Sequence, residues 1–173
     1  MPDLKKLLST RLDGGEPHGV KHVLLQCALV FGSIGLIMTL YEFFGGIVVA
    51  SLGASGFILF VTPHTQTSRA INLIGGYVCG SVSGVGFGYL HKALGVLDFE
   101  KFHVTLIIGC AAAAAFAMFL MVWKGVVHPP AAALALGLAA DAKSVVTAAA
   151  AMVGIVILCG VRRLLSKYLK NLV

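Results

Sequence analysis

The stretch that decides the fold predicted here is Val127-His128-Pro129-Pro130-Ala131-Ala132-Ala133-Leu134-Ala135-Leu136-Gly137. Proline has no backbone N–H and holds φ near the helical value, so it is tolerated in the first turn of a helix and disruptive further in. We therefore expect a helix that begins at Pro129 or Pro130. The N–H groups of Ala131 to Ala133 would lack intrahelical partners there, and together with the positive end of the helix dipole they would form a potential anion site.

The composition around this helix is that of a membrane protein. Of the 173 residues, 58% are hydrophobic and 12% are charged, and the mean hydropathy is +0.96. A soluble domain carries about twice that charged fraction. We therefore expect an all-α polytopic membrane protein that forms a single transmembrane domain over residues 1–173.

The basic residues are concentrated before the first apolar segment and after the last one, and the net charge is +6. The positive-inside rule then places both termini in the cytoplasm. The expected location is the inner (plasma) membrane of the bacterial type, with several passes through it. The alternative for these charges is plain snorkelling, which needs no partner. No basic stripe has interleaved aromatic residues, so nucleic acid is not an expected partner. The flanking residues are Lys5, Lys6, Arg11, Lys21, Arg162, Arg163, Lys167 and Lys170.

Four long apolar segments and two short ones follow one another along the chain. Each short segment is rich in small residues: Ile47 to Val61 contains a glycine-rich interruption, so we expect a loop to about Ser55 and a helix from Gly56. The second is the helix that follows Pro129. Residues 1–19 predict a helix on the cytoplasmic surface, and residues 166–173 a cytoplasmic tail. The long segments are His22 to Leu40, Arg69 to Leu90, His103 to Trp123 and Ser144 to Val161.

This order repeats, because residues 20–91 and 103–165 each contain a long segment, a short helix, a polar link and a second long segment. The sequence thus predicts four full transmembrane helices and two short broken or re-entrant helices in a two-fold internal repeat. If the short helices fold back, the protein has four spans and parallel halves. If they cross the membrane, it has six spans and inverted halves.

Glycines recur at every fourth position of the second long segment, at Gly76, Gly80, Gly84 and Gly88. Small residues four apart on one face allow two membrane helices to pack backbone to backbone. We interpret these glycines as a packing seam, and the alternative is a smooth pore wall.

Polar residues within membrane reach are the candidates for a substrate site. Arg69 stays charged and can hold an oxyanion with two N–H groups, although it is equally suited to anchoring the chain at the interface. His128 could donate a hydrogen bond to an anion, relay a proton or cap the turn before the prolines. For Asn72 the alternative is a hydrogen bond to another helix, and for Lys143 it is pairing with Asp141. The remaining candidates are Ser55, Gly56, His64, Pro129, Pro130, Ala131 and Ala132.

Other chemistry is not indicated. The four cysteines lie one per apolar segment without CxxC spacing, and the histidines lack metal-ligand spacing. Catalytic motifs such as HExxH and GxSxG do not occur. We expect no cofactor, no metal site and no enzymatic activity.

The triplet His128-Pro129-Pro130 followed by three alanines resembles the signature of the HPP family of integral membrane proteins. The resemblance extends over roughly residues 20 to 165, although the family often has a proline at the position of Ser68 and a histidine at that of Tyr77. It implies a small protein with four spans, and the plant chloroplast members are associated with nitrite transport. The first-half matches are Gly53-Ala54-Ser55, Pro63-His64, Arg69, Asn72 and Gly75-Gly76.

The expected function is a transporter or channel for a small inorganic anion, with nitrite as the leading substrate. The N–H groups of Ala131 to Ala133 and of Gly56 would bind the anion, Arg69 would supply the counter-charge, and His128 a hydrogen bond or a proton. The alternative is a non-transporting membrane scaffold or sensor subunit, in which the glycine seam mediates assembly. A bundle this small encloses little lumen, so we expect a homo-oligomer in the lipid bilayer.

Overall fold

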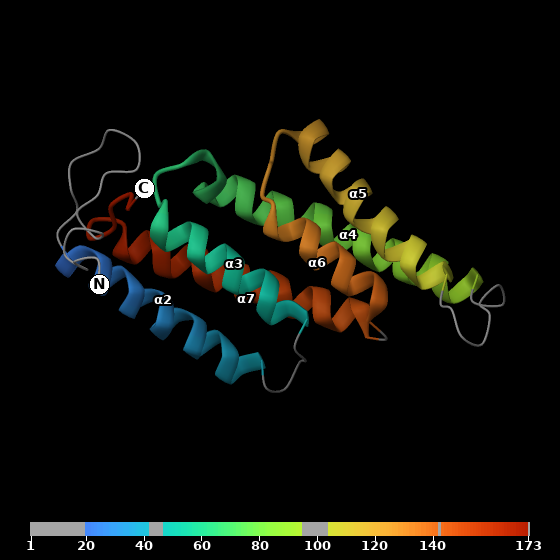
Figure 1. Cartoon of the computed structure of the whole chain (residues 1–173), viewed down its shortest axis with the longest axis horizontal. Coiled ribbons are helices and arrows are strands. Elements are labelled where there is room, and N and C mark those ends of the chain that lie inside the picture. Colours follow the sequence, from blue (N-terminus) through green and yellow to red (C-terminus); the bar gives the residue numbers. More distant parts are fainter. Residues whose placement is uncertain (1–19, 42–46, 95–103, 142, 173) are drawn as a thin grey trace, which may run out of the picture.

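The computed structural model describes residues 20–41, 47–94, 104–141 and 143–172, and this part of the chain is a bundle of α-helices with no strand (Figure 1). The surface helix predicted for residues 1–19 lies outside the described residues. The elements are α2 (Val20–Tyr41), α3 (Ile47–Val61), the short 3₁₀ helix η1 (Gln66–Ser68), α4 (Ala70–Leu94), α5 (Val104–Lys124), α6 (Pro130–Ala140) and α7 (Ser144–Leu165).

In the part of the chain that the structure describes, three helices are long and apolar enough to cross a membrane: α4 with 25 residues, α5 with 21 and α7 with 22. Their outer faces carry large exposed apolar side chains such as Val82, Phe119 and Val153, which suits contact with lipid. The helix α2 has 22 residues, whereas α3 has 15 and α6 has 11. The prediction of an all-helical membrane protein is confirmed.

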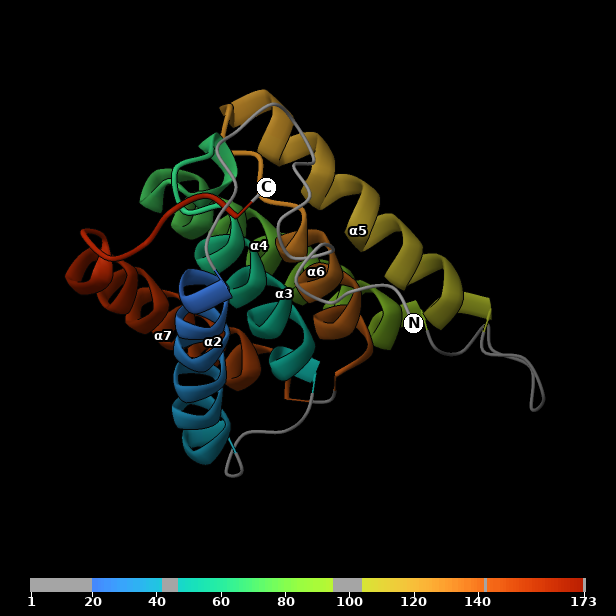
Figure 2. The same ribbon diagram turned by 60° about the vertical axis from the view of Figure 1, so that its left-hand side comes forward.

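The short helix α6 lies at the centre of the bundle. Its residues Ala131, Leu134, Ala135 and Leu138 are fully buried, and α6 packs against α3, α4, α5 and α7. Figure 2, in which the molecule is turned from the view of Figure 1, shows α6 surrounded by α3, α4 and α5. The helix that contains the sequence motif is therefore the core of the fold.

Contacts between side chains give the relative directions of the helices. Gly76 near the start of α4 faces His128, just before α6, and Gly88 near the end of α4 faces Ala139 near the end of α6. The two helices therefore run in the same direction. On α3, by contrast, Ser51 contacts Pro130 and Ser55 contacts His128, so α3 runs opposite to α6.

The helix α5 runs opposite to α4, because Ser83 bonds to Ala113 while His91 bonds to Thr105. The Arg162 side chain near the end of α7 donates to the carbonyl of Pro63, just beyond the end of α3. The ends of α3 and α7 therefore lie together. Figure 1 shows that successive helices alternate in direction along the bundle.

The helix α3 corrects one prediction. The sequence predicts a loop up to Ser55 and a helix only from Gly56, but the structure has one continuous helix from Ile47 to Val61. A glycine in a helix interior costs about 1 kcal/mol, while fully burying a side chain such as Val48 or Leu52 contributes about 1.5–3 kcal/mol. Packing therefore outweighs the glycines. Gly56 lies inside α3 and is not at a helix N-terminus.

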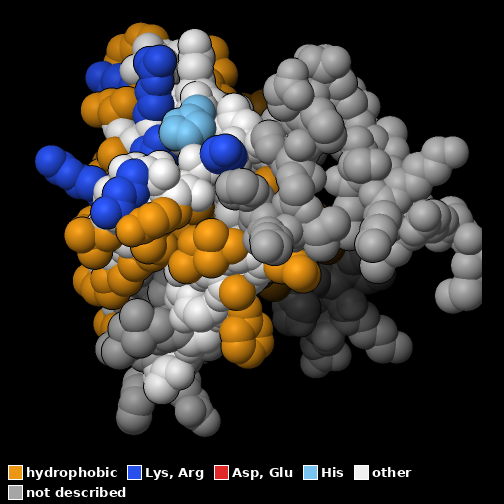
Figure 3. All heavy atoms as spheres, turned by 90° about the vertical axis from the view of Figure 1, so that its left-hand side faces the viewer, with side chains coloured by type: hydrophobic (Ala, Val, Ile, Leu, Met, Phe, Trp, Pro, Cys, Tyr) orange, Lys and Arg blue, Asp and Glu red, His pale blue; other side chains and the backbone are white. Residues whose placement is uncertain are grey.

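The beginning of α2 and the residues after α7 lie at the same end of the bundle, where Gln26 Nε2 donates to the carbonyl of Lys170 at 2.7 Å. Lys and Arg side chains gather on this end together with a histidine (Figure 3). We call it the basic end and define it by Arg69, Arg162, Arg163, Lys167 and Lys170.

Candidate functional site

Four polar side chains meet inside the bundle and form what we call the polar cluster: Ser51, Ser55, Tyr77 and His128. Each is at most 1% exposed. The two serines come from α3, the tyrosine from α4, and the histidine from the link that precedes α6. The cluster therefore joins three helices that are far apart in the sequence.

The contacts of His128 define which ring nitrogen carries the hydrogen. Its Nδ1 lies 3.2 Å from the carbonyl oxygen of Thr67, and its Nε2 lies 2.8 Å from Ser55 Oγ. A carbonyl oxygen can only accept, so Nδ1 is the donor. In the neutral ring Nε2 is then the acceptor, and Ser55 is the hydroxyl that donates to it.

The hydroxyl groups complete the network. Ser51 Oγ donates to the carbonyl of Pro130 at 2.9 Å, and Tyr77 Oη lies 2.9 Å from both Ser51 Oγ and Ser55 Oγ. Ser55 Oγ also lies 2.9 Å from the carbonyl of Ser51. Each hydroxyl has one hydrogen, so the cluster contains more contacts than hydrogens and its hydrogen bonds can be exchanged among several partners.

Local sequence explains why these groups meet. Ser51 and Ser55 are four residues apart, which places both on the same face of α3. On α4, Gly76 and Gly80 make room for the chain around His128: a Cβ atom at Gly76 would lie 2.6 Å from the Cβ of His128, and one at Gly80 would collide with the carbonyl oxygen of Ala131. The interpretation of the glycines as a packing seam is confirmed, and the partner is α6 of the same chain.

The helix α6 begins at Pro130, as predicted, but its first N–H groups are not free. Ala131 N–H donates to the carbonyl of His128, and Ala132 N–H donates to that of Pro129, both at 3.0 Å. Pro129 already has helical angles, φ −53° and ψ −38°, so the chain makes a tight turn that supplies these acceptors. The prediction of free donors on Ala131 and Ala132 is therefore wrong.

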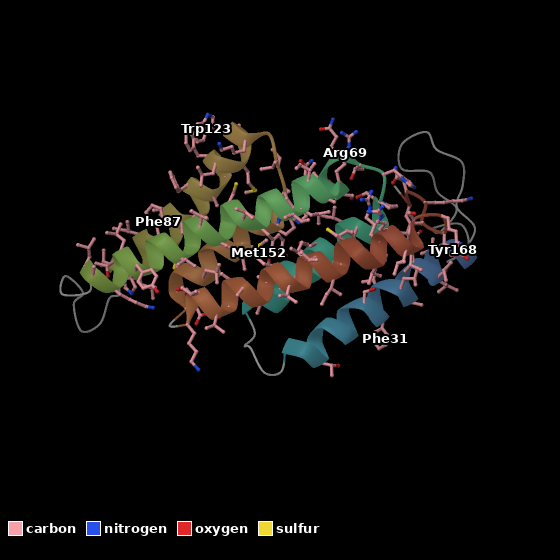
Figure 4. All side chains as sticks on the ribbon, turned by 180° about the vertical axis from the view of Figure 1, so that it is seen from behind. Phe31, Arg69, Phe87, Trp123, Met152 and Tyr168 are labelled. Carbon is pink, nitrogen blue, oxygen red and sulfur yellow. The ribbon has the colours of Figure 1, made fainter. Side chains whose placement is uncertain are left out.

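The other predicted site residues lie away from the polar cluster. Arg69 is exposed at the start of α4, on the outside of the bundle (Figure 4). Asn72 Nδ2 donates to the carbonyl of Gln66 at 2.6 Å and so closes a local turn. His64 bonds to the chain beyond α7 through Leu169 and Asn171.

Lys143 lies at the opposite end of the bundle from Arg69, beside the start of α7. There its backbone N–H donates to Asp141 Oδ1 at 3.0 Å, and Thr147 Oγ1 donates to Asp141 Oδ2. Asp141 thus stabilises the first turn of α7. Of the predicted site residues, the structure brings together Ser55, His128 and Pro130.

Ser51 and Tyr77 are the two members of the polar cluster that sequence reasoning missed. The serine spacing on an apolar helix is a signal for Ser51. For Tyr77 the signal is a phenol in the middle of a membrane helix, since a buried tyrosine hydroxyl needs a partner. Within the described residues, no three His, Cys, Asp or Glu side chains lie together in a way that could hold a metal ion.

Comparisons with known proteins give one match. The profile of a family described as "HPP, transmembrane region" matches residues 16–171 of the chain. Neither a curated protein nor a solved structure matches.

Proposed function

Because this chain belongs to the HPP family, and thus to a family of membrane proteins, we propose that it is a transporter or channel for a small inorganic anion, with nitrite as the leading substrate. The observation that carries the proposal is the polar cluster around His128, which is completely buried inside an apolar bundle. Polar and ionisable groups at membrane depth are costly, and where they occur they commonly serve a substrate or ion pathway.

The depth of the cluster supports this role. The 11 residues of α6 span roughly 16 Å, about half the thickness of the hydrocarbon core. With the far end of α6 at one membrane surface, the link of residues 125–129 would lie near the middle of the hydrocarbon core, beside Gly75 and Gly76 of α4. Non-helical backbone occurs at such a depth where protein covers it or where it lines a pathway.

We also propose that the two halves form an inverted repeat. In the contacts between helices, α2 packs on α3 as α5 packs on α6, and α7 packs on α3 as α4 packs on α6. Corresponding helices run in opposite directions, because successive helices alternate. The two long helices that flank each short helix run in the same direction (Figure 1), which favours crossing over re-entry. In transporters with such repeats the substrate site lies near the midplane.

The orientation follows from charge. The basic end carries Arg69, Arg162, Arg163, Lys167 and Lys170, and the positive-inside rule would place it, with both termini, in the cytoplasm. At this end Arg69 would attract anions electrostatically and need not bind them at the cluster. The donors within the cluster would be the hydroxyl groups of Ser55 and Tyr77, because the N–H of the His128 ring is bonded to the carbonyl of Thr67.

The scaffold alternative is less well supported. It requires the glycine seam for assembly, but Gly76, Gly80 and Gly84 contact α6 of their own chain and are not available to a second molecule. Assembly as a homo-oligomer would instead use the exposed apolar faces of α5 or α7. The number of subunits in such an oligomer can be measured by mass photometry in detergent.

The experiment is flux of nitrite into liposomes that contain the purified protein, beside a panel of chloride, nitrate and formate. Arg69→Gln removes one positive charge at the basic end, and Lys143→Gln is a matched control at the opposite end. We expect saturable nitrite uptake that Arg69→Gln slows by about tenfold through lost attraction, whereas Lys143→Gln changes it little. Folded, inserted protein without flux of any of these anions would refute the proposal. Equal flux in both variants would remove Arg69 from it.

A further inference from the structure

The chain beyond α7 folds back over the basic end. It is held at three points by the end of α3 and the link after it, two through its backbone and one through a side chain. Leu172 N–H donates to the carbonyl of Val61 at 2.8 Å, the His64 ring lies 3.1 Å from the carbonyl of Leu169, and His64 N–H donates to the side-chain oxygen Asn171 Oδ1 at 3.0 Å. Figure 1 shows the C-terminus beside the end of α3. We call residues 166–172 the tail.

A single apolar side chain anchors the tail. Leu169 is only 2% exposed and belongs to the hydrophobic core of the bundle. A hydrogen bond adds to this anchor, since Gln26 Nε2 of α2 donates to the carbonyl of Lys170. Arg162 of α7 holds the link itself by donating to the carbonyl of Pro63. The tail therefore ties α2, the end of α3 and α7 together.

The segment that the tail holds is the link between α3 and α4, residues 62–69, and this link reaches the polar cluster. The carbonyl of Thr67 accepts from His128 Nδ1. The link is also bonded within itself, since Ser68 Oγ donates to the carbonyl of Thr62 at 2.6 Å and the Ser68 side chain is fully buried. The link is therefore a compact turn that runs from the end of α3 to the polar cluster.

We propose that the link of residues 62–69 is a lid over His128 at the basic end, and that the tail is the latch that keeps this lid closed. The role of the lid rests on the proposed function, because an open lid would admit an anion from the basic end to the polar cluster. Release of Leu169 frees His64 and the carbonyl of Val61 from the tail, and the link, still held at Pro63 by Arg162, can then lift from His128. Regions held by few buried apolar contacts open more readily than the core.

The test measures access to the cluster directly. The four native cysteines, Cys27, Cys79, Cys110 and Cys159, are replaced by alanine, and Ser55→Cys supplies a single thiol beneath the link. The purified protein in liposomes is treated on both sides with a small charged methanethiosulfonate reagent, and the labelling rate of residue 55 is measured. Ser51→Cys, one turn deeper from the link, is a second reporter in case the first disturbs His128.

Leu169→Ala is compared with Leu164→Ala, which removes the same atoms from a side chain that is 78% exposed. We expect Leu169→Ala to raise the labelling rate at least about tenfold, because truncation of a buried leucine weakens its anchor strongly, while Leu164→Ala leaves the rate unchanged. Equal rates in the two variants, or rapid labelling in the parent, would overturn the proposal. Anion flux is measured on separate samples, so a lid without transport and transport without a lid are distinguishable results.

Discussion

Two of the surfaces by which α6 contacts the rest of the bundle are built in opposite ways. Along the glycine seam, α4 approaches α6 because side chains are absent: a Cβ atom at Gly84 would lie 2.6 Å from the carbonyl oxygen of Ala135. In the polar cluster, α3 and α4 reach the start of α6 through hydrogen bonds of Ser51, Ser55 and Tyr77. The seam thus depends on shape, and the cluster on the pairing of donors with acceptors.

This difference determines which kind of substitution destabilises each surface. A close contact between backbones has no flexible side chain that could move aside, so an added atom must separate the helices. A buried hydrogen-bond network tolerates little loss, because a donor or acceptor left without a partner keeps its full desolvation cost. Substitutions on either surface therefore test different physical terms.

The largest effect is expected at the seam. In Gly80→Ala the new methyl group would collide with the carbonyl oxygen of Ala131, which belongs to the first turn of α6. We expect a loss of about 3 kcal/mol or more in the free energy of unfolding, since neither backbone can yield without parting the helices. Reversible unfolding in mixed micelles measures it. Stability equal to that of the parent protein would show that α6 does not pack against α4 at this point.

An intermediate effect is expected in the polar cluster. Ser55→Ala leaves His128 Nε2 without its partner in a fully buried site, so we expect a loss of about 1–3 kcal/mol. The matched control is Ser83→Ala. Ser83 is equally buried and donates to the carbonyl of Ala113, which keeps its bond within α5. A smaller loss is expected for this control in the same unfolding assay, and equal losses would contradict a special role for the cluster.

The smallest effect, and one of opposite sign, is expected at Gly86, which lies on α4 but outside the seam. A Cβ atom there meets nothing within 4 Å. Alanine is the better helix former by about 1 kcal/mol, so Gly86→Ala should stabilise the protein by up to that amount in the same assay. A marked destabilisation would mean that the open face of α4 is covered, for instance by a second copy of the chain.

Much of the fold was predictable because it depends on local and periodic patterns. The apolar segments, the start of α6 at Pro130 and the seam at every fourth residue all follow from spacing along the chain. The helix α3 was not predictable in the same way. Its glycines favour a break locally, and only the packing of Val48 and Leu52 against other helices outweighs that preference.

The candidate site was predictable only in part. The prolines indicated His128, and the expected helix start indicated Ser55, but Tyr77 and Thr67 reach the histidine from other parts of the chain. The prediction of free N–H groups on Ala131 and Ala132 was wrong, because the turn through Pro129 provides acceptors that a count of unpaired N–H groups does not include.

The sequence by itself therefore determined the membrane class, the order of the helices and the position of the motif helix, since composition and periodicity act over a few turns of chain. The tertiary structure alone decided which polar groups meet: Ser55 and His128 are 73 residues apart, and His64 and Leu169 are 105 apart. The physical reason is that a hydrogen bond depends on the positions of two groups in space, and no local pattern specifies the partner of a group that lies so far along the chain.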